Sequence, residues 1–266
     1  MLEIQNVSKT FNAGTVNQKT ALNGLNLKLN EGDFVTVIGG NGAGKSTMLN
    51  AVAGVWPVDE GKILIDGVDV TRLGEHQRAA YIGRVFQDPM TGTAATMQIE
   101  ENLALAYLRA GTAPNAIFSR ISRKDKALFR EKLALLDMGL EDRMKQPVGL
   151  LSGGQRQALT LLMATLVTPK LLLLDEHTAA LDPATAEKVL ALTKSIVAEK
   201  KITCLMVTHN MHQALELGNR TLMMADGHIV MDVSGKERER MTVDSLVAKF
   251  KAGTGRALDN DRMLLS

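Results

Sequence analysis

Apolar and polar residues alternate in two early segments, residues 2–7 and 22–29, which is the pattern of a strand with one buried face. The two segments are expected to pair with each other. A further hairpin is predicted over residues 62–70, because Asp66-Gly67 supplies the positive φ angles that a two-residue turn requires. Together these segments indicate an antiparallel patch near the N-terminus.

A buried strand is predicted next to this patch. Residues 34–38 form a short run of apolar, mostly β-branched residues. The run ends in a glycine-rich loop, residues 39–44, after which residues 45–55 carry apolar side chains at helical spacing. The chain therefore has a strand, a glycine loop and a helix in immediate succession.

The later part of the chain alternates helices with strands. Continuous apolar runs at residues 171–174 and 202–207 are typical of strands buried on both faces, and helices are predicted at 151–168 and 184–200. A hairpin around Asp-Gly is predicted over residues 221–233. Strands joined by helices indicate an α/β fold with a parallel sheet covered on both faces.

Residues 99–145 carry apolar side chains at helical spacing, which indicates a helical subdomain of about residues 90–165 inserted in this fold. Its basic stretch, residues 120–132, is interpreted as a solvated helix face, with contact to a partner or to lipid head groups as the alternative. We expect one domain over residues 1–240 that contains the insertion, followed by a C-terminal helix and tail over residues 241–266.

The composition limits the class of protein. With 266 residues, of which 45% are hydrophobic, the chain can bury an ordinary core, and a net charge of +2 gives no field that favours nucleic acid as a partner. The lone Cys204 excludes an intrachain disulfide and a cysteine-clustered zinc site. No segment has the long apolar pattern of a membrane span or the N-terminal pattern of a signal peptide, so a cytoplasmic location is expected.

The glycine loop satisfies the phosphate-loop pattern G-x-x-x-x-G-K-[ST] between a strand and a helix. Its backbone N–H groups are expected to surround phosphate oxygens, helped by the N-terminus of the following helix. Lys45 would reach the terminal phosphates, and the Ser46 hydroxyl would hold Mg²⁺. The residues expected to bind the phosphates are Gly39, Asn41, Gly42, Ala43, Gly44, Lys45, Ser46 and Thr47.

Two adjacent carboxylates, Asp175 and Glu176, follow the strand predicted at 171–174. Open α/β sheets bind their ligands at this end of the strands, so we expect Asp175 to hold Mg²⁺ with Ser46 and Glu176 to polarise the attacking water. An ordinary pair of surface carboxylates is the alternative. His209 follows the next strand and would stand on the same sheet edge within reach of a γ-phosphate; a structural histidine is the alternative.

A second candidate anion site is predicted at Ser152-Gly153-Gly154-Gln155. Ser152 and Gln155 form a capping box for the following helix, which by itself explains both residues. The two glycines in the first helical turn are unfavourable in a helix, so something is expected to approach this backbone closely. Held away from the chain's own phosphate loop, this helix end would contact a nucleotide bound to another copy.

With these motifs in this order, the chain resembles the nucleotide-binding subunit of an ATP-binding cassette transporter over about residues 2–233. The resemblance makes residues 39–47 the Walker A loop, 151–155 the signature and 171–176 Walker B. It implies ATP and Mg²⁺ as ligands and ATP hydrolysis as the reaction. The implied fold is a P-loop core with a parallel sheet, an antiparallel β subdomain and an inserted helical subdomain.

The resemblance also implies roles for four further residues. Gln87 is the Q-loop residue that senses Mg²⁺ and the γ-phosphate, and it adjoins the groove where a membrane subunit docks. Asp182 belongs to the D-loop, and His209 is the switch histidine. Phe11 lies where the family has an aromatic residue that stacks on adenine, with a core phenylalanine at a strand end as the alternative.

The mechanism that the resemblance implies uses two copies of the chain, head to tail, around two ATP molecules. Each ATP would lie between one chain's Walker A loop and the other chain's signature. Closure on ATP and reopening after hydrolysis would drive a transmembrane permease, with the chain on the inner face of the cell membrane. An extracytoplasmic substrate-binding protein is expected in the full system.

Import is favoured because the chain stops soon after the nucleotide-binding core, without the fused membrane domain common in exporters. Residues 88–93 and the triplet Asp175-Glu176-His177 are similar to ATPases of amino-acid importers. An export motor, or one that releases lipids or peptides, is the alternative within the family. A soluble cassette ATPase of the iron–sulfur assembly type is an alternative of another class. Translation cassettes carry two cassettes in one chain and DNA-repair cassettes carry zinc-binding or long coiled-coil insertions, and none of these segments is found in this sequence.

Three positions depart from the family's pattern. His177 stands where proline is usual, which predicts a less rigid turn after Glu176. Ala158 stands where the signature helix usually has an arginine, which predicts an altered basal rate. Gly40 stands where proline or serine is common, which predicts a looser phosphate loop.

Overall fold

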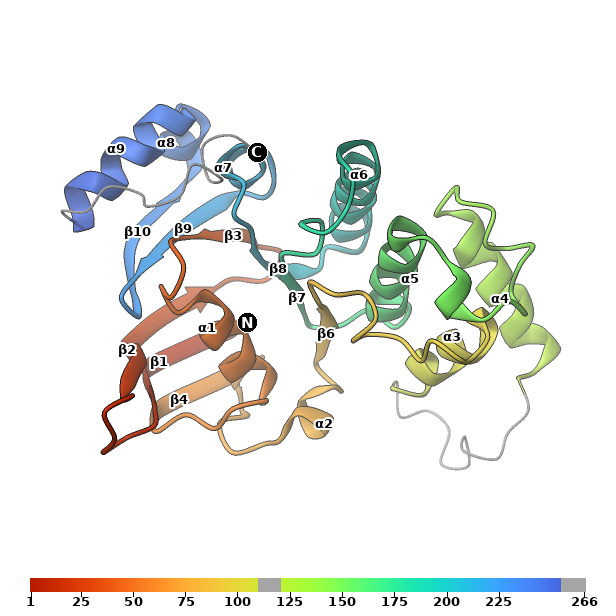
Figure 1. Cartoon of the computed structure of the whole chain (residues 1–266), viewed down its shortest axis with the longest axis horizontal. Helices are drawn as coiled ribbons and strands as arrows, with labels where there is room; N and C mark the ends of the chain where they lie inside the picture. The colour runs from red at the N-terminus through yellow and green to blue at the C-terminus, as the bar shows by residue number, and fades with distance from the viewer. Residues whose placement is uncertain (110–120, 255–266) are drawn as a thin grey trace.

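The structure of the protein is a computed structural model that describes residues 1–109 and 121–254, with side chains as far as residue 250 (Figure 1). The chain forms two sheets with helices around them, and a group of helices extends to one side. Residues 110–120 of the predicted helical subdomain and 255–266 of the predicted tail lie outside the described residues.

A six-stranded sheet has the order β10-β9-β3-β8-β7-β6, in which every neighbouring pair is parallel except β10 with β9. Its strands are β3 (Phe34–Ile38), β6 (Ile82–Val85), β7 (Leu171–Asp175), β8 (Thr203–Val207), β9 (Arg220–Ala225) and β10 (His228–Ser234). The prediction of a parallel sheet is confirmed. The predicted hairpin at 221–233 is confirmed as β9 and β10, which extend that sheet at one edge.

The N-terminal strands form a separate antiparallel sheet of order β2-β1-β4-β5. The strands are β1 (Leu2–Phe11), β2 (Lys19–Leu29), β4 (Glu60–Ile65) and β5 (Val68–Asp69). Both the pairing of the first two segments and the hairpin around Asp66-Gly67 are therefore confirmed. Figure 1 shows helix α1 (Lys45–Ala53) beside this sheet, next to β3.

Four clusters of buried side chains hold these layers together. The largest joins the inner faces of both sheets to α1, and includes Val35, Val37, Met48 and Leu49. The opposite face of the parallel strands is covered by α5 (Gly153–Thr165) and α6 (Pro183–Lys200). Thus both faces of the parallel strands are buried, which explains their continuous apolar runs.

The remaining two clusters lie at opposite ends of the molecule. One packs α3 (Ile99–Leu108) and α4 (Arg123–Ala134) against α5, within the range predicted to be helical. The other packs α9 (Val243–Thr254) on α7 (Met211–Glu216) and on Ile38 at the end of β3. Short helices α2 (Glu75–Arg78) and α8 (Gly235–Glu239) and the 3₁₀ turn η2 (Val148–Leu150) complete the described elements.

Two details of the predicted elements were wrong. The helix predicted at 151–168 begins at Gly153, because Ser152 caps it, and ends at Thr165, before Pro169. The strand β6 was missed, because only the first and last of its four residues are large and apolar. Gly83 and Arg84 lie between them, so the segment shows neither a continuous apolar run nor a regular alternation. Within the described part of the chain, no helix has both the length and the apolar character of a membrane-spanning segment.

Candidate functional site

The loop between β3 and α1 lies tightly against its neighbours, and glycine is required at two of its positions. A Cβ atom on Gly39 would overlap the carbonyl oxygen of Met224, and one on Gly44 would lie 2.5 Å from that of Ala21. Both glycines also have positive φ angles, 152° and 102°. The loop is therefore fixed between β9 and β2, beside a space that it helps to line.

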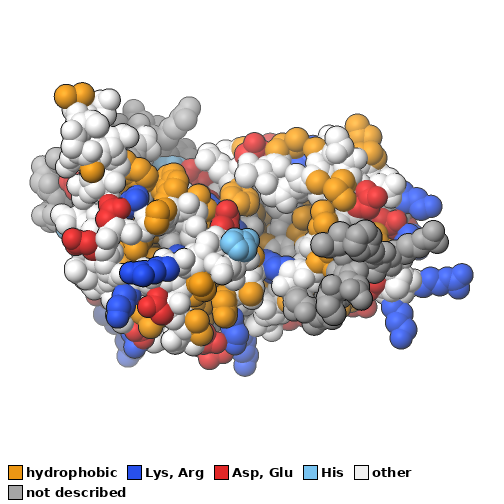
Figure 2. Space-filling view, turned by 90° about the horizontal axis from the view of Figure 1, so that it is seen from below, with side chains coloured by type: hydrophobic (Ala, Val, Ile, Leu, Met, Phe, Trp, Pro, Cys, Tyr) orange, Lys and Arg blue, Asp and Glu red, His pale blue; other side chains and the backbone are white. Residues whose placement is uncertain are grey.

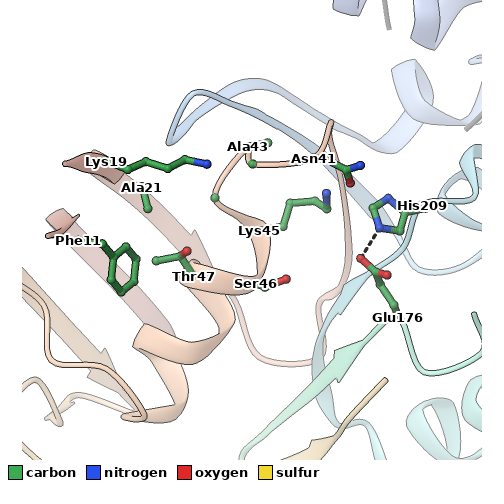
Figure 3. Close-up of a pocket in the computed structure, with 12 residues that line it drawn as sticks. Phe11, Lys19, Ala21, Asn41, Ala43, Lys45, Ser46, Thr47, Glu176 and His209 are labelled. Carbon is green, nitrogen blue, oxygen red and sulfur yellow. Dashed lines mark ion pairs between the residues drawn. The ribbon is translucent and has the colours of Figure 1, made fainter. Parts of the chain in front are cut away.

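That space is a pocket of about 250 Å³. Figure 3 shows it bounded by the loop and α1, by the ends of β1 and β2, and by the two residues that follow β7 and β8. Its lining consists of Phe11, Lys19, Ala21, Asn41, Gly42, Ala43, Gly44, Lys45, Ser46, Thr47, Glu176 and His209. Sequence motifs far apart in the chain thus meet at one pocket.

The positive end of α1 faces this pocket. The residue that caps α1, Gly44, has no side chain to bond the first N–H groups, and the first turn carries no acidic residue. Unpaired N–H groups at a helix N-terminus bind anions, and phosphate in particular. Ser46 and Thr47 add two hydroxyl groups at the same place.

Lys45 is folded under the loop in this structure. Its ammonium group donates hydrogen bonds to the carbonyl oxygens of Gly39, at 2.7 Å, and of Gly40, at 3.1 Å. The side chain is buried, and this burial lowers the pKa of Lys45, opposed by the charges of Glu176 and Asp175. An arriving phosphate would offer stronger, charged acceptors to the same ammonium group.

Glu176 and His209 form an ion-pairing contact across the pocket from Lys45 (Figure 3). The Glu176 Oε1 atom lies 2.5 Å from Nε2 of His209. Strands β7 and β8 are parallel neighbours, so the residues that follow them emerge side by side at one edge of the sheet. Glu176 has a φ of 45°, which is an unfavourable conformation for glutamate, and its N–H bonds Val207 O at 3.0 Å.

Asp175 lies just outside the lining of the pocket. Burial raises its pKa, while Arg84, 3.9 Å away, acts in the opposite direction. No closer partner of this carboxylate occurs among the described residues. A half-buried carboxylate without a direct hydrogen bond among the described residues, next in sequence to Glu176 of the pocket lining, provides the hard oxygen donors that Mg²⁺ prefers.

Gln87, the third residue expected at the metal, is placed elsewhere. It follows β6 by two residues, is exposed, and is not part of the pocket lining. The structure therefore brings together Lys45, Ser46, Glu176 and His209, and leaves Gln87 outside.

The predicted second anion site, residues 152–155, also lies outside the pocket. The capping box is confirmed: Ser152 Oγ accepts from Gln155 N at 3.3 Å, and Gln155 Oε1 accepts from Ser152 N at 3.2 Å. Ser152 and Gly153 are exposed at the start of α5. In Figure 1 β6 and β7 separate this helix from α1.

The close approach predicted for the backbone of residues 153–154 is found at Gly154, where the neighbour is another residue of the same chain rather than a ligand. A Cβ atom on Gly154 would overlap the Cγ2 methyl of Thr185, in the first turn of α6. Asp182 caps α6 by accepting a hydrogen bond from Thr185 N at 3.0 Å. The N-terminal turns of α5 and α6, and with them Ser152 and Asp182, are thus held next to each other.

Phe11, Lys19 and Ala21 form the wall of the pocket contributed by the antiparallel sheet. Phe11 is half-buried and packs edge-to-face on Trp56, with ring centroids 4.8 Å apart. Sequence reasoning missed Lys19, although Lys19 pairs with Phe11 in the register of β1 and β2. No sequence pattern indicated this pair, because the predicted strands, residues 2–7 and 22–29, stop short of both residues.

A model of the ABC transporter family matches residues 22–179, more than half of the 266 residues. The chain belongs to the ABC transporter family. It is an ATP-binding cassette that binds ATP, and its hydrolysis of ATP to ADP and phosphate powers a membrane transporter. The prediction of this family and of its fold is confirmed.

Curated relatives support the same assignment. A tyrosine transport ATP-binding protein of Clostridioides difficile is 43% identical over 251 residues, covering 94% of this chain and 99% of the relative. The spermidine/putrescine import ATP-binding protein PotA of Haemophilus ducreyi is 33% identical over 94% of this chain, and the methionine import ATP-binding protein MetN of Vibrio vulnificus 35% identical over 86%. The cassette spans only 62% and 64% of those two longer relatives.

Solved structures of cassettes have the same architecture. A dimeric structure of the ATP-binding cassette MJ0796 in a post-hydrolysis state, bound to ADP and Pi, has a TM-score of 0.74 at 29% identity, covering 88% of this chain and 98% of that one. The ADP conformation of MJ1267, an ATP-binding cassette of an ABC transporter, has a TM-score of 0.76 at 26% identity, covering 95% and 98%.

Proposed function

We propose that this cassette is the ATPase subunit of a bacterial importer that takes up a small solute of the amino-acid type. The observation that carries the proposal is the likeness to the tyrosine transport ATP-binding protein, which extends over 99% of that protein at 43% identity. Two further relatives are named as import proteins. The amino-acid class agrees with the expectation from residues 88–93 and from Asp175-Glu176-His177.

ATP is proposed to occupy the pocket with its adenine against Phe11 and its phosphates at the loop and Lys45. The lysine would exchange its bonds to Gly39 and Gly40 for phosphate oxygens, and the unpaired N–H groups of α1 would bind the remaining oxygens. Glu176 would accept a proton from the attacking water, and His209 would hold that carboxylate in place.

Mg²⁺ is proposed as the cofactor, and it would neutralise phosphate charge during hydrolysis. Ser46 and Asp175 are the residues that would hold it. Gln87 would join them only after the segment that follows β6 moves toward the pocket, because its side chain is exposed outside the lining. The same segment is the proposed docking place of the permease subunit.

A second copy of the chain is proposed to complete each ATP site. Ser152, Gly153, Gly154 and Gln155 lie outside the chain's own pocket, with Asp182 beside them, so these residues are available to a nucleotide held by a partner. Dimeric structures of MJ0796 support this arrangement. The permease would place the dimer on the inner face of the membrane, and a substrate-binding protein would act outside it.

We also propose that residues 1–240 act as the nucleotide-binding domain, with the helical subdomain over about 90–165, and that residues 241–266 form a C-terminal appendage. The separate apolar cluster of α3, α4 and α5 supports the first division. The packing of α9 on α7 and β3, in a cluster of its own, supports the second division.

Glu176→Gln tests the hydrolysis mechanism. The amide keeps the size of the side chain but cannot accept the proton of the attacking water, so we expect ATPase activity to fall by about two orders of magnitude or more. ATP binding should be retained, because the phosphate loop is unchanged. A variant with more than a tenth of the wild-type rate would show that Glu176 is not the base.

A pull-down with the same variant tests the transport role. In mild detergent with ATP and Mg²⁺ we expect a membrane protein with several spans to copurify, together with an extracytoplasmic solute-binding protein. Tyrosine and other amino acids would then be tested for binding to that protein. Recovery of soluble scaffold proteins alone would contradict the importer and favour an assembly ATPase.

A further inference from the structure

Lys19 is the charged residue of the pocket lining to which no motif assigns a role. It begins β2 and pairs in register with Phe11, the last residue of β1. Figure 3 shows its side chain extending toward the phosphate loop. The ammonium group would be 3.0 Å from a Cβ atom on Gly42, so it lies against the tip of the loop.

The charge of Lys19 is uncompensated among the described residues. Lys9, on the neighbouring strand, pairs with Asp59 at 2.9 Å, and Lys28, at the other end of β2, pairs with Glu3 at 3.0 Å. No carboxylate of the described part of the chain lies within ion-pairing distance of Lys19. A free ammonium group at the rim of a pocket built from backbone N–H groups adds to its attraction for an anion.

Lys19 and Lys45 bound the pocket from opposite walls. Lys45 is buried beneath the loop, whereas Lys19 is exposed and reaches the loop from the antiparallel sheet. A nucleotide with its base at Phe11 and its terminal phosphate at Lys45 has its inner phosphates between these points. They would pass close to the Lys19 ammonium group.

We propose that Lys19 is a nucleotide-binding residue that pairs with the phosphate chain of ATP from the wall opposite Lys45. The proposal rests on the placement of ATP in this pocket described above. Lys19 also joins the phosphates to the antiparallel sheet, so that this sheet contacts the phosphates as well as the adenine.

The test is nucleotide affinity of Lys19→Met, measured by displacement of a fluorescent ATP analogue with ATP, ADP and adenosine. Exposed charge pairs are weak, so we expect the affinities for ATP and ADP to fall by about three- to five-fold and that for adenosine to stay within two-fold. The difference between wild type and variant should shrink as NaCl is raised, because salt screens an exposed pair.

Two control variants distinguish a direct contact of Lys19 with the phosphates from a general effect of removing one positive charge. Lys28→Met removes the same charge from the same strand, away from the pocket, and should leave all affinities unchanged. Lys19→Arg keeps the charge and should restore most of the affinity for ATP. The proposal for Lys19 would be overturned if Lys19→Met binds ATP as tightly as the wild type, or if its affinity for adenosine falls as much as its affinity for ATP. The placement of ATP in this pocket is tested separately, because it would be overturned if Lys45→Ala still binds ATP with the affinity of the wild type.

Discussion

His177 replaces the proline that the family has after the two carboxylates, and its ring is almost completely buried. The Nε2 atom lies 3.1 Å from Oγ1 of Thr193 in α6, and Nδ1 has no hydrogen-bond partner among the described residues. Burial lowers the pKa of His177 to about 4, so the ring is neutral at physiological pH. The imidazole thus links the turn after Glu176 to α6.

This burial predicts an acid-sensitive contribution to stability. The unfolded chain protonates His177 near pH 6.5, whereas the folded chain does so only near pH 4. The contribution is therefore complete above pH 6.5 and is lost as the pH falls toward 4, by about 3 kcal/mol in all. In His177→Gln, which cannot titrate, urea unfolding should show a shallower decline in the free energy of unfolding between these pH values. Parallel declines in the two proteins would contradict the prediction.

Residues within contiguous motifs could be predicted from the sequence, and residues defined by cross-strand register could not. Lys45, Ser46 and Glu176 are recognisable because their neighbours in the sequence are also their neighbours in the site. The predicted strands, residues 2–7 and 22–29, end before Phe11 and begin after Lys19, because the residues between them show no regular alternation of apolar and polar side chains. The pairing of Phe11 with Lys19, which closes the hairpin, therefore follows only from the structure.

At the scale of elements, Gly154 in the first turn of α5 serves the packing of two helices. The sequence indicated that Gly154 must admit a close neighbour, but whether that neighbour is a ligand or the protein follows only from the contact with Thr185. Likewise, the sequence of β6 did not predict a strand, because this segment is held in the sheet by its pairing with β7 rather than by a pattern in its own four residues. Tertiary contacts therefore decided the points that local patterns left open.

Gly154→Ala should destabilise the protein by about 1–3 kcal/mol, because its methyl group would overlap the Thr185 methyl. Adding Thr185→Ser removes that methyl and keeps the backbone N–H that Asp182 caps. Urea unfolding of both variants should show that the second substitution restores most of the lost stability. If the double variant is as unstable as Gly154→Ala, the contact with Thr185 is not the reason for the glycine.

The double variant also separates packing from ligand binding. With stability restored, ATPase activity should remain low if Gly154 must approach a nucleotide of the partner chain. Full recovery of activity would mean that the glycine serves the packing of α5 on α6 alone.

At the scale of the whole molecule, one chain carries two incomplete halves of a site. The phosphate loop, Glu176 and His209 share a pocket, and the exposed Ser152 lies outside it, at the start of α5. In Figure 1, α5 lies on the other side of β6 and β7 from α1. The Ser152 hydroxyl accepts the hydrogen bond that caps α5. Complementary halves on separate copies would explain why both motifs are present but apart.

Mixing two inactive variants tests this arrangement. Lys45→Ala disables the phosphate loop, and Ser152→Asp keeps the cap of α5 but sets a negative charge against a bound phosphate. In a mixed dimer one site combines both defects and the other combines the intact loop with the intact signature. Random pairing should therefore restore roughly a quarter of the wild-type ATPase rate, although each variant alone is inactive. If differently tagged chains form mixed dimers and activity stays at the level of the single variants, the site is not shared between copies.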